Sequence, residues 1–155
     1  MTCRSGGNKM ELKDYQSYAF KIEGNEQDGY IAVMRGHDNC FTGDHTYPET
    51  VEMARSLITD CDIGCFADHA QMPPANKPEQ GDVVISTTEE KAAKIMLRNA
   101  IVQSGMDLDE IAEKLGLSRK QLDARLRFSN GVKLSFIARV CEVIGFTMGL
   151  TITRK

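Results

Sequence analysis

The 155-residue chain is predicted to have an α+β fold, in which a unit built on a sheet precedes an all-helical unit. Two observations predict it. Apolar residues alternate with the period of strands before residue 45, whereas after residue 88 they recur at helical spacing. The charge also changes near residue 88. Residues 1–87 contain 7 Lys and Arg residues and 14 Asp and Glu residues, whereas residues 88–155 contain 12 Lys and Arg residues and 8 Asp and Glu residues. We therefore expect an acidic domain over residues 14–87 and a basic domain over residues 88–155.

The first domain is expected to open with an antiparallel meander. Alternating apolar side chains predict strands over residues 15–23, 30–34 and 39–42. A turn at residues 24–28 joins the first two strands as a hairpin. The glycine-rich, polar N-terminus, residues 1–13, is expected to be disordered.

A helix and a fourth strand are expected to complete this domain. Thr46 and Glu49 form a capping box with a proline in the first turn, which predicts a helix ending near Gly64 or one turn later. A proline-rich segment, residues 72–81, has the composition of a linker. The strand pattern at residues 82–87 has no local partner, so we expect it to join the N-terminal sheet.

The second domain is expected to begin with a helix that Thr87 and Glu90 cap. Two short helices follow, with the spacing of a DNA-binding helix-turn-helix: one over residues 108–115, a turn at Gly116, and a second helix starting at Ser118. A last helix, over residues 134–144, ends at a glycine.

The second helix of this pair has the features of a recognition helix that enters the major groove of DNA. Ser118 and Gln121 form a capping box, and basic residues lie in and after the first turn. The candidates for reading base edges are Arg119, Lys120 and Gln121. The candidates for phosphate contacts are Ser118, Arg125 and Lys133. An ordinary helical bundle with a solvated basic face is the alternative explanation of the same pattern.

The C-terminal tail alternates perfectly over residues 146–153, which predicts a strand. A lone strand leaves its backbone groups unpaired. We expect it to pair across a two-fold axis with the same strand of a second copy, or else with the N-terminal sheet. A dimer would place two recognition helices about 34 Å apart on a pseudo-palindromic operator; whether dimers join into tetramers is left open.

Several classes of function are not expected. No apolar run approaches the roughly 20 residues of a membrane span, and the N-terminus lacks a secretory signal, so a cytoplasmic protein is predicted. The odd number of cysteines, five, suits free thiols in a reducing compartment. Cys61, Cys65 and His69 would share one face of a helix, yet cysteines on such a stripe are more often buried apolar groups. No catalytic residue, metal or cofactor is predicted, and metal binding by these three residues is left open.

The two halves together resemble the HicB family of antitoxins from HicA–HicB toxin-antitoxin systems. The resemblance rests on Asp28-Gly29-Tyr30, on Cys40-Phe41-Thr42-Gly43 leading to Thr46, and on Glu49 in the helix, followed by the proline-rich loop, the strand and a helix containing Asn99-Ala100. The chain departs from the family at Met34–Asn39, where a Pro-Asp-hydrophobic-Pro-Gly segment is usual, and at Thr50, where alanine is usual.

This resemblance implies a degraded ribonuclease H fold of order β-β-β-α-β that has lost its metal-binding carboxylates, so no enzymatic activity is expected. It also implies that the N-terminal domain binds a small basic HicA-like ribonuclease toxin and that the second domain binds operator DNA. On this interpretation the candidate toxin-binding residues are Asp28, Tyr30, Asp38, Phe41 and Asp44.

Two other interpretations stay open. The chain could be a stand-alone helix-turn-helix regulator whose first domain senses a ligand or oligomerises. It could also be an enzyme whose sheet keeps a metal-dependent activity.

Overall fold

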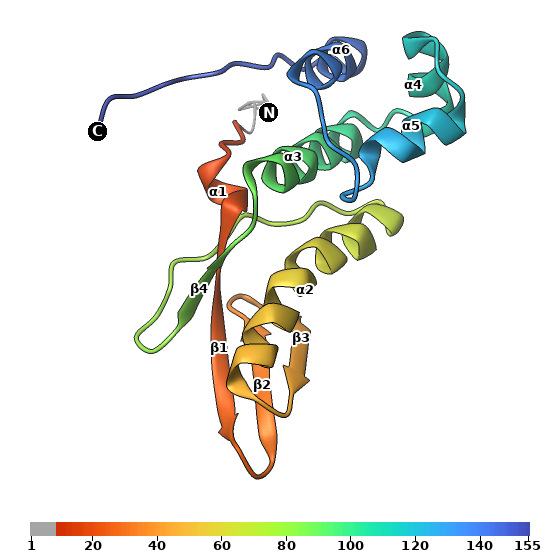
Figure 1. The fold of residues 1–155 in the computed structure, drawn as a ribbon. Helices are drawn as coiled ribbons and strands as arrows, with labels where there is room; N and C mark the ends of the chain where they lie inside the picture. The colour runs from red at the N-terminus through yellow and green to blue at the C-terminus, as the bar shows by residue number, and fades with distance from the viewer. Residues whose placement is uncertain (1–8) are drawn as a thin grey trace, which may run out of the picture.

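The computed structural model describes residues 9–155, which form one antiparallel sheet and six helices. The sheet has the strand order β3-β2-β1-β4, and helix α2 covers one of its faces (Figure 1). The strands are β1 (Ser17–Asn25), β2 (Gly29–Met34), β3 (His37–Asp44) and β4 (Val83–Ser86). The helices are α1 (Lys13–Gln16), α2 (Tyr47–Ala67), α3 (Glu89–Ser104), α4 (Leu108–Leu115), α5 (Arg119–Leu126) and α6 (Leu134–Ile144). The α+β class and the order strand, strand, strand, helix, strand are as predicted.

The predicted hairpin and the fourth strand are both present. In the β1–β2 pair, Phe20 lies opposite Met34, and in the β1–β4 pair Tyr18 lies opposite Ile85. The predicted start of the first strand is wrong, because Tyr15 belongs to α1. Of the predicted disordered segment 1–13, residues 1–8 lie outside the described chain. Met10 and Leu12 pack against the apolar core, which ties this part of the chain down.

Helix α2 begins as the capping box predicts. The Thr46 hydroxyl accepts from the Glu49 backbone N–H at 3.3 Å and donates to the Glu49 carboxylate at 2.7 Å. The helix continues through Gly64 for almost one more turn. Thr50 is fully buried, and its hydroxyl donates to the Thr46 carbonyl at 2.8 Å, so the hydroxyl that replaces the usual alanine methyl is satisfied.

The N-cap of α3 is Thr88, so the predicted cap at Thr87 is one residue too early. The Thr88 hydroxyl accepts from the Lys91 N–H at 3.3 Å. Thr87 is still tied to the sheet unit, because its N–H donates to the Gln16 carbonyl at 2.8 Å. The helices α4, α5 and α6 begin and end within about a residue of the positions predicted from sequence.

Two apolar cores meet on α3. The sheet cluster consists of buried side chains from α1, the strands β1, β2 and β4, helix α2, Met72 and the first half of α3. The helical cluster consists of buried side chains from the second half of α3 and from α4, α5 and α6. Ala92 and Ile95 belong to the first cluster, whereas Leu97 and Ile101 belong to the second. Helix α3 therefore joins the two halves rather than separating them.

Buried polar groups on α3 reinforce this junction. The Arg98 guanidinium donates to the Leu126 carbonyl at 2.7 Å and lies 3.5 Å from the Asp62 carboxylate of α2. The central guanidinium carbon of Arg98 lies over the rings of Phe128 and Phe66, at 4.5 and 5.0 Å from their centroids. One side chain thus connects α2, α3 and the end of α5.

Two further side chains of α3 fix loops. Asn99 donates to the Met72 carbonyl at 2.7 Å and accepts from the Met72 N–H at 2.8 Å. The Lys94 ammonium, almost fully buried, donates to the carbonyls of Arg127 and Asn130. The proline-rich segment 72–81, which has the composition of a linker, is consequently held against the core at its first residue.

The C-terminal tail, residues 146–155, forms no strand in the structure. Its apolar side chains are exposed, with Leu150 at 74% and Ile152 at 90%. The predicted pairing with the N-terminal sheet is wrong, because within residues 9–155 the four strands of that sheet pair only with one another. A strand needs a partner to satisfy its backbone groups, so a single chain leaves the tail in coil. Pairing with a second copy stays a prediction.

The Asp62 carboxyl is expected to make stability depend on pH. Burial raises the pKa of Asp62 to about 7, although the Arg98 charge opposes this shift. Between the unperturbed pKa near 4 and pH 7, the folded state thus holds a proton that the unfolded chain releases. The free energy of unfolding should fall by roughly 2 to 4 kcal/mol as the pH rises through this window.

The test compares urea unfolding of the wild type and of Asp62→Asn at pH 5 and pH 8. Asp62→Asn should flatten the profile, and Asp60→Asn, at an exposed position of the same helix, should leave it unchanged. The same pH dependence in wild type and Asp62→Asn would contradict this account.

Candidate functional site

One face of the sheet is open. The side chain of Cys40 in β3 is bonded to Cys61 of α2, so it points toward the helix. Because successive side chains of a strand point to opposite faces, the side chain of Phe41 points away from the helix. Phe41 lies opposite Val33 in the ladder, and Ile31 lies opposite Gly43. The exposed fractions of Phe41 and Ile31 are 61% and 57%. Exposed apolar groups of this size on one sheet face are typical of a surface that binds another protein.

A shallow acidic hollow lies where β2 begins and β3 ends. Asp28, Tyr30 and Asp44 line it, and its volume is about 350 Å³. The Tyr30 ring meets Tyr47 of α2 edge to face, with centroids 5.6 Å apart. Gly43 is required here, because a Cβ atom at this position would lie 2.5 Å from the Tyr30 carbonyl oxygen. The hollow lies beside the open face, since Ile31 lines it too.

The five candidate toxin-binding residues therefore do not form one site. Asp28, Tyr30 and Asp44 come together at the hollow, Phe41 lies on the open face, and Asp38 is exposed near the start of β3. Sequence reasoning missed the apolar contribution of Ile31, although the alternation in residues 30–34 placed it opposite the buried Ala32.

Helices α4 and α5 are joined by a tight turn. Gly116 has a φ of 69°, a left-handed conformation that favours glycine, and the following N–H, of Leu117, donates to the Ala112 carbonyl at 2.9 Å. At the start of α5 the Ser118 hydroxyl accepts from the Gln121 N–H at 3.1 Å, and the Gln121 side-chain oxygen accepts from the Ser118 N–H at 2.9 Å. The capping box predicted from sequence is present.

The three candidates for reading bases differ in how they are held. The Arg119 guanidinium donates to the carboxylates of Asp123, at 3.0 Å, and Asp109, at 3.3 Å. The oxygen of the Gln121 side chain is used by the cap, which leaves its NH₂ group to donate. Lys120 is exposed. Contact with DNA by Arg119 thus requires exchange of two exposed ion pairs, each of which contributes little to stability. Sequence reasoning missed both ion pairs, although the i, i+4 spacing of Arg119 and Asp123 is a signal for the first of them.

The remaining DNA-binding candidates surround the same helix. Ser118 is its N-cap, and the Arg125 guanidinium lies 5.3 Å from the centroid of the Phe136 ring of α6. Lys133, at the N-cap of α6, is exposed. Sequence reasoning missed Arg139, which donates to the Leu115 carbonyl at 3.0 Å and so ties α6 to the end of α4.

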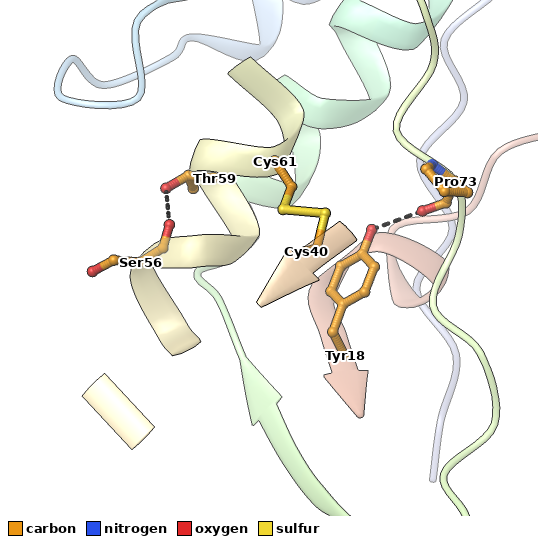
Figure 2. The surroundings of a disulfide bond; sticks show 6 residues. All are labelled: Tyr18, Cys40, Ser56, Thr59, Cys61 and Pro73. Atoms are coloured by element: carbon orange, nitrogen blue, oxygen red, sulfur yellow. Dashed lines mark hydrogen bonds between the residues drawn. A yellow bond between two sulfur atoms is a disulfide. The ribbon is translucent and has the colours of Figure 1, made fainter. Parts of the chain in front are cut away.

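The expectation of free thiols throughout is wrong, because Cys40 and Cys61 form a disulfide between β3 and α2 (Figure 2). The packing of the edge strand on the helix brings two cysteines 21 residues apart into contact. His69 lies beyond the end of α2, so Cys61, Cys65 and His69 do not share a continuous helix. Within residues 9–155, no group of three or more His, Cys, Asp or Glu side chains is arranged to hold a metal ion.

The chain is similar over most of its length to several curated antitoxins. It is 26% identical over 130 residues to antitoxin HicB 2 of Photorhabdus laumondii, a match that covers 83% of this chain and 90% of that protein. It is 23% identical over 123 residues to antitoxin HicB of Escherichia coli, covering 79% and 88%. Antitoxin HicB of Pseudomonas fluorescens is 29% identical over 98 residues, covering 63% of this chain and 62% of that protein.

The chain is thus similar to HicB antitoxins at 23% to 29% identity over 63% to 87% of its length. No protein-family model matches it. The resemblance to HicB antitoxins inferred from short motifs in both halves is confirmed by these matches, which are long enough to cover parts of both the sheet unit and the helical unit. Among the described helices, none has the length and apolarity needed to cross a membrane.

Proposed function

We propose that this chain is an antitoxin that neutralises a small basic HicA-type ribonuclease toxin and represses its own operon by binding operator DNA. The observation that carries the proposal is the similarity to curated HicB antitoxins across 79% to 87% of the chain in three of the matches. A non-enzymatic role in the cytoplasm accompanies it. The sheet unit is then a ribonuclease H-like domain without its catalytic carboxylates.

The toxin contact is assigned to the open sheet face and the acidic hollow beside it. Phe41 and Ile31 offer apolar area, and Asp28 and Asp44 offer negative charge next to it. Residues 1–87 carry seven more acidic than basic residues, so this part of the surface attracts a protein that otherwise binds RNA phosphates. Apolar anchors rimmed by charge are the usual organisation of a specific interface.

The operator contact is assigned to α5, with α4 and α5 acting as a helix-turn-helix. Residues 88–155 carry four more basic than acidic residues, and binding to a polyanion depends on this local patch rather than on the net charge of the whole chain. Arg119, Lys120 and Gln121 read bases, whereas Ser118, Arg125 and Lys133 contact phosphates. A homodimer, formed by pairing of the two C-terminal tails, would present two such helices to a pseudo-palindromic operator.

Removal of the Phe41 ring should weaken toxin binding. Phe41→Ala is expected to lower the affinity for the HicA-type toxin by about ten- to a hundredfold, as for an aromatic anchor, with little change in stability because the ring is exposed. Ile63→Ala, at an apolar position of α2 that is 48% exposed, is the matched control and should bind as wild type. Calorimetric titration with the purified toxin measures both. Equal affinity for wild type and Phe41→Ala would remove the open face from the interface.

Loss of the two basic groups in the first turn of α5 should weaken operator binding. Arg119→Ala combined with Lys120→Ala is expected to reduce operator affinity by at least tenfold and to reduce the preference over unrelated DNA. Lys9→Ala combined with Lys21→Ala removes the same charge from the sheet unit, and should change affinity by less than about twofold. Fluorescence anisotropy with labelled duplexes at fixed salt gives both values. A double variant of α5 that binds operator as tightly as wild type would exclude α5 as the recognition helix.

A further inference from the structure

A disulfide fastens the edge strand of the sheet to its covering helix (Figure 2). Cys40 of β3 and Cys61 of α2 are bonded, and their Cα atoms lie 6.4 Å apart. Both residues are only partly buried. The bond therefore lies close to the surface, at the strand that carries Phe41.

Strand β3 is held on two sides. Within residues 9–155 it is an edge strand that pairs only with β2, and its other main contacts are with α2. None of its eight residues is fully buried, whereas β1 buries Tyr18, Ala19 and Phe20. Burial of apolar surface thus contributes less to holding β3 than to holding β1. The covalent bond adds to the packing of this strand on α2, which includes the hydrogen bond from the Thr50 hydroxyl to the Asp44 carbonyl.

A third thiol is nearby but poorly reactive. Cys65 lies one helical turn after Cys61 and is not disulfide-bonded. Burial raises the pKa of the Cys65 thiol, and the charges of Asp62 and Asp68 raise it further. Only a thiolate attacks a disulfide efficiently. Among the described free thiols, Cys65 is therefore a weak candidate for attack on the Cys40–Cys61 bond, and an external thiol is a stronger one.

We propose that the Cys40–Cys61 pair is a reversible redox site whose oxidised form fixes β3 on α2 and whose reduced form releases it. The physical reason is the combination of this bond with the cytoplasmic location proposed above, because disulfides in reducing compartments are mostly transient and redox-sensing. The ligand class is a low-molecular-weight thiol such as glutathione, or its disulfide.

The chemistry is a thiol–disulfide exchange. A reductant thiolate attacks one of the two protein sulfurs, the S–S bond breaks, and the departing sulfur takes a proton. A second reductant thiolate then attacks the mixed disulfide, so that two protein thiols and one reductant disulfide result. Two electrons pass from the reductant sulfurs to the protein sulfurs, and the oxidised reductant drives the reverse reaction.

The consequence for toxin binding rests on the proposed antitoxin function. Because β3 carries Phe41 and Asp44, its release from α2 removes part of the surface assigned to the toxin. The oxidised chain should bind the toxin more tightly than the reduced chain.

The experiment uses the full chain equilibrated with either oxidised glutathione or dithiothreitol. Titration of thiols in denaturant should find two fewer thiols in the oxidised sample. Without any toxin, reduction should speed hydrogen exchange of the β3 amides by about tenfold or more and leave the β1 amides at Tyr18 and Phe20 unchanged. Cys40→Ser and Cys61→Ser should each reproduce the reduced pattern in both buffers. Cys141→Ser, in the helical cluster, should respond to redox as wild type does.

Toxin titration of the two forms completes the test. An affinity at least about tenfold weaker in the reduced form supports the whole inference. Equal thiol counts in the two buffers, or β3 exchange that does not respond to reduction, would overturn it. If reduction speeds hydrogen exchange of the β3 amides but the chain binds no HicA-type toxin in either form, the redox site is upheld and the proposed antitoxin function is contradicted. If reduction speeds hydrogen exchange of the β3 amides but the toxin affinity is equal in both forms, the link between the redox site and toxin binding is overturned.

Discussion

Helix α3 has to bury two sides at once, and the arrangement of the two halves depends on this constraint. Its first half completes the core beneath the sheet, and its second half forms the floor on which α4, α5 and α6 pack. A helix buried on both sides leaves little room for solvated side chains. Its polar residues are accordingly used as connectors: Arg98 reaches α2 and α5, Asn99 holds Met72, and Lys94 holds the loop after α5. Paired buried groups of this kind cost free energy if one partner is removed, so they specify one relative orientation of the units.

Much of the fold follows from local signals. Thr46 with Glu49 and Ser118 with Gln121 fix helix starts because a side chain and a backbone N–H satisfy each other within four residues. Strand alternation predicted the meander, and the lack of a local partner predicted that residues 82–87 join the sheet. The N-cap of α3 was misplaced by one residue because both Thr87 and Thr88 are good caps, and only the long-range bond from Thr87 to Gln16 decides between them. The buried positions of Lys94 and Arg98 were not predictable, since charged residues at helical spacing usually indicate a solvated face.

The sequence indicates which residues belong to the candidate toxin-binding site, but it does not indicate how they are arranged on the surface. Short motifs indicated the region of Asp28 to Asp44, yet only the register of β2 and β3 separates the hollow at Tyr30 from the open face at Phe41. The ion pair of Arg119 with Asp123 lies within α5 and has an i, i+4 spacing that is visible in the sequence, whereas the pair with Asp109 depends on how α4 and α5 cross. The disulfide depends on the packing of β3 on α2, which no spacing along the chain reveals.

The central claim is that two surfaces on opposite parts of the chain, joined by α3, bind two different partners. Hydrogen-exchange footprinting of the full chain, alone, with a HicA-type toxin and with operator DNA, tests it most directly. The account predicts that the toxin slows exchange of amides in β2 and β3 and that the operator slows exchange at the start of α5. Slower exchange confined to α4 and α5 in the presence of toxin would contradict it, as would protection of the sheet by DNA.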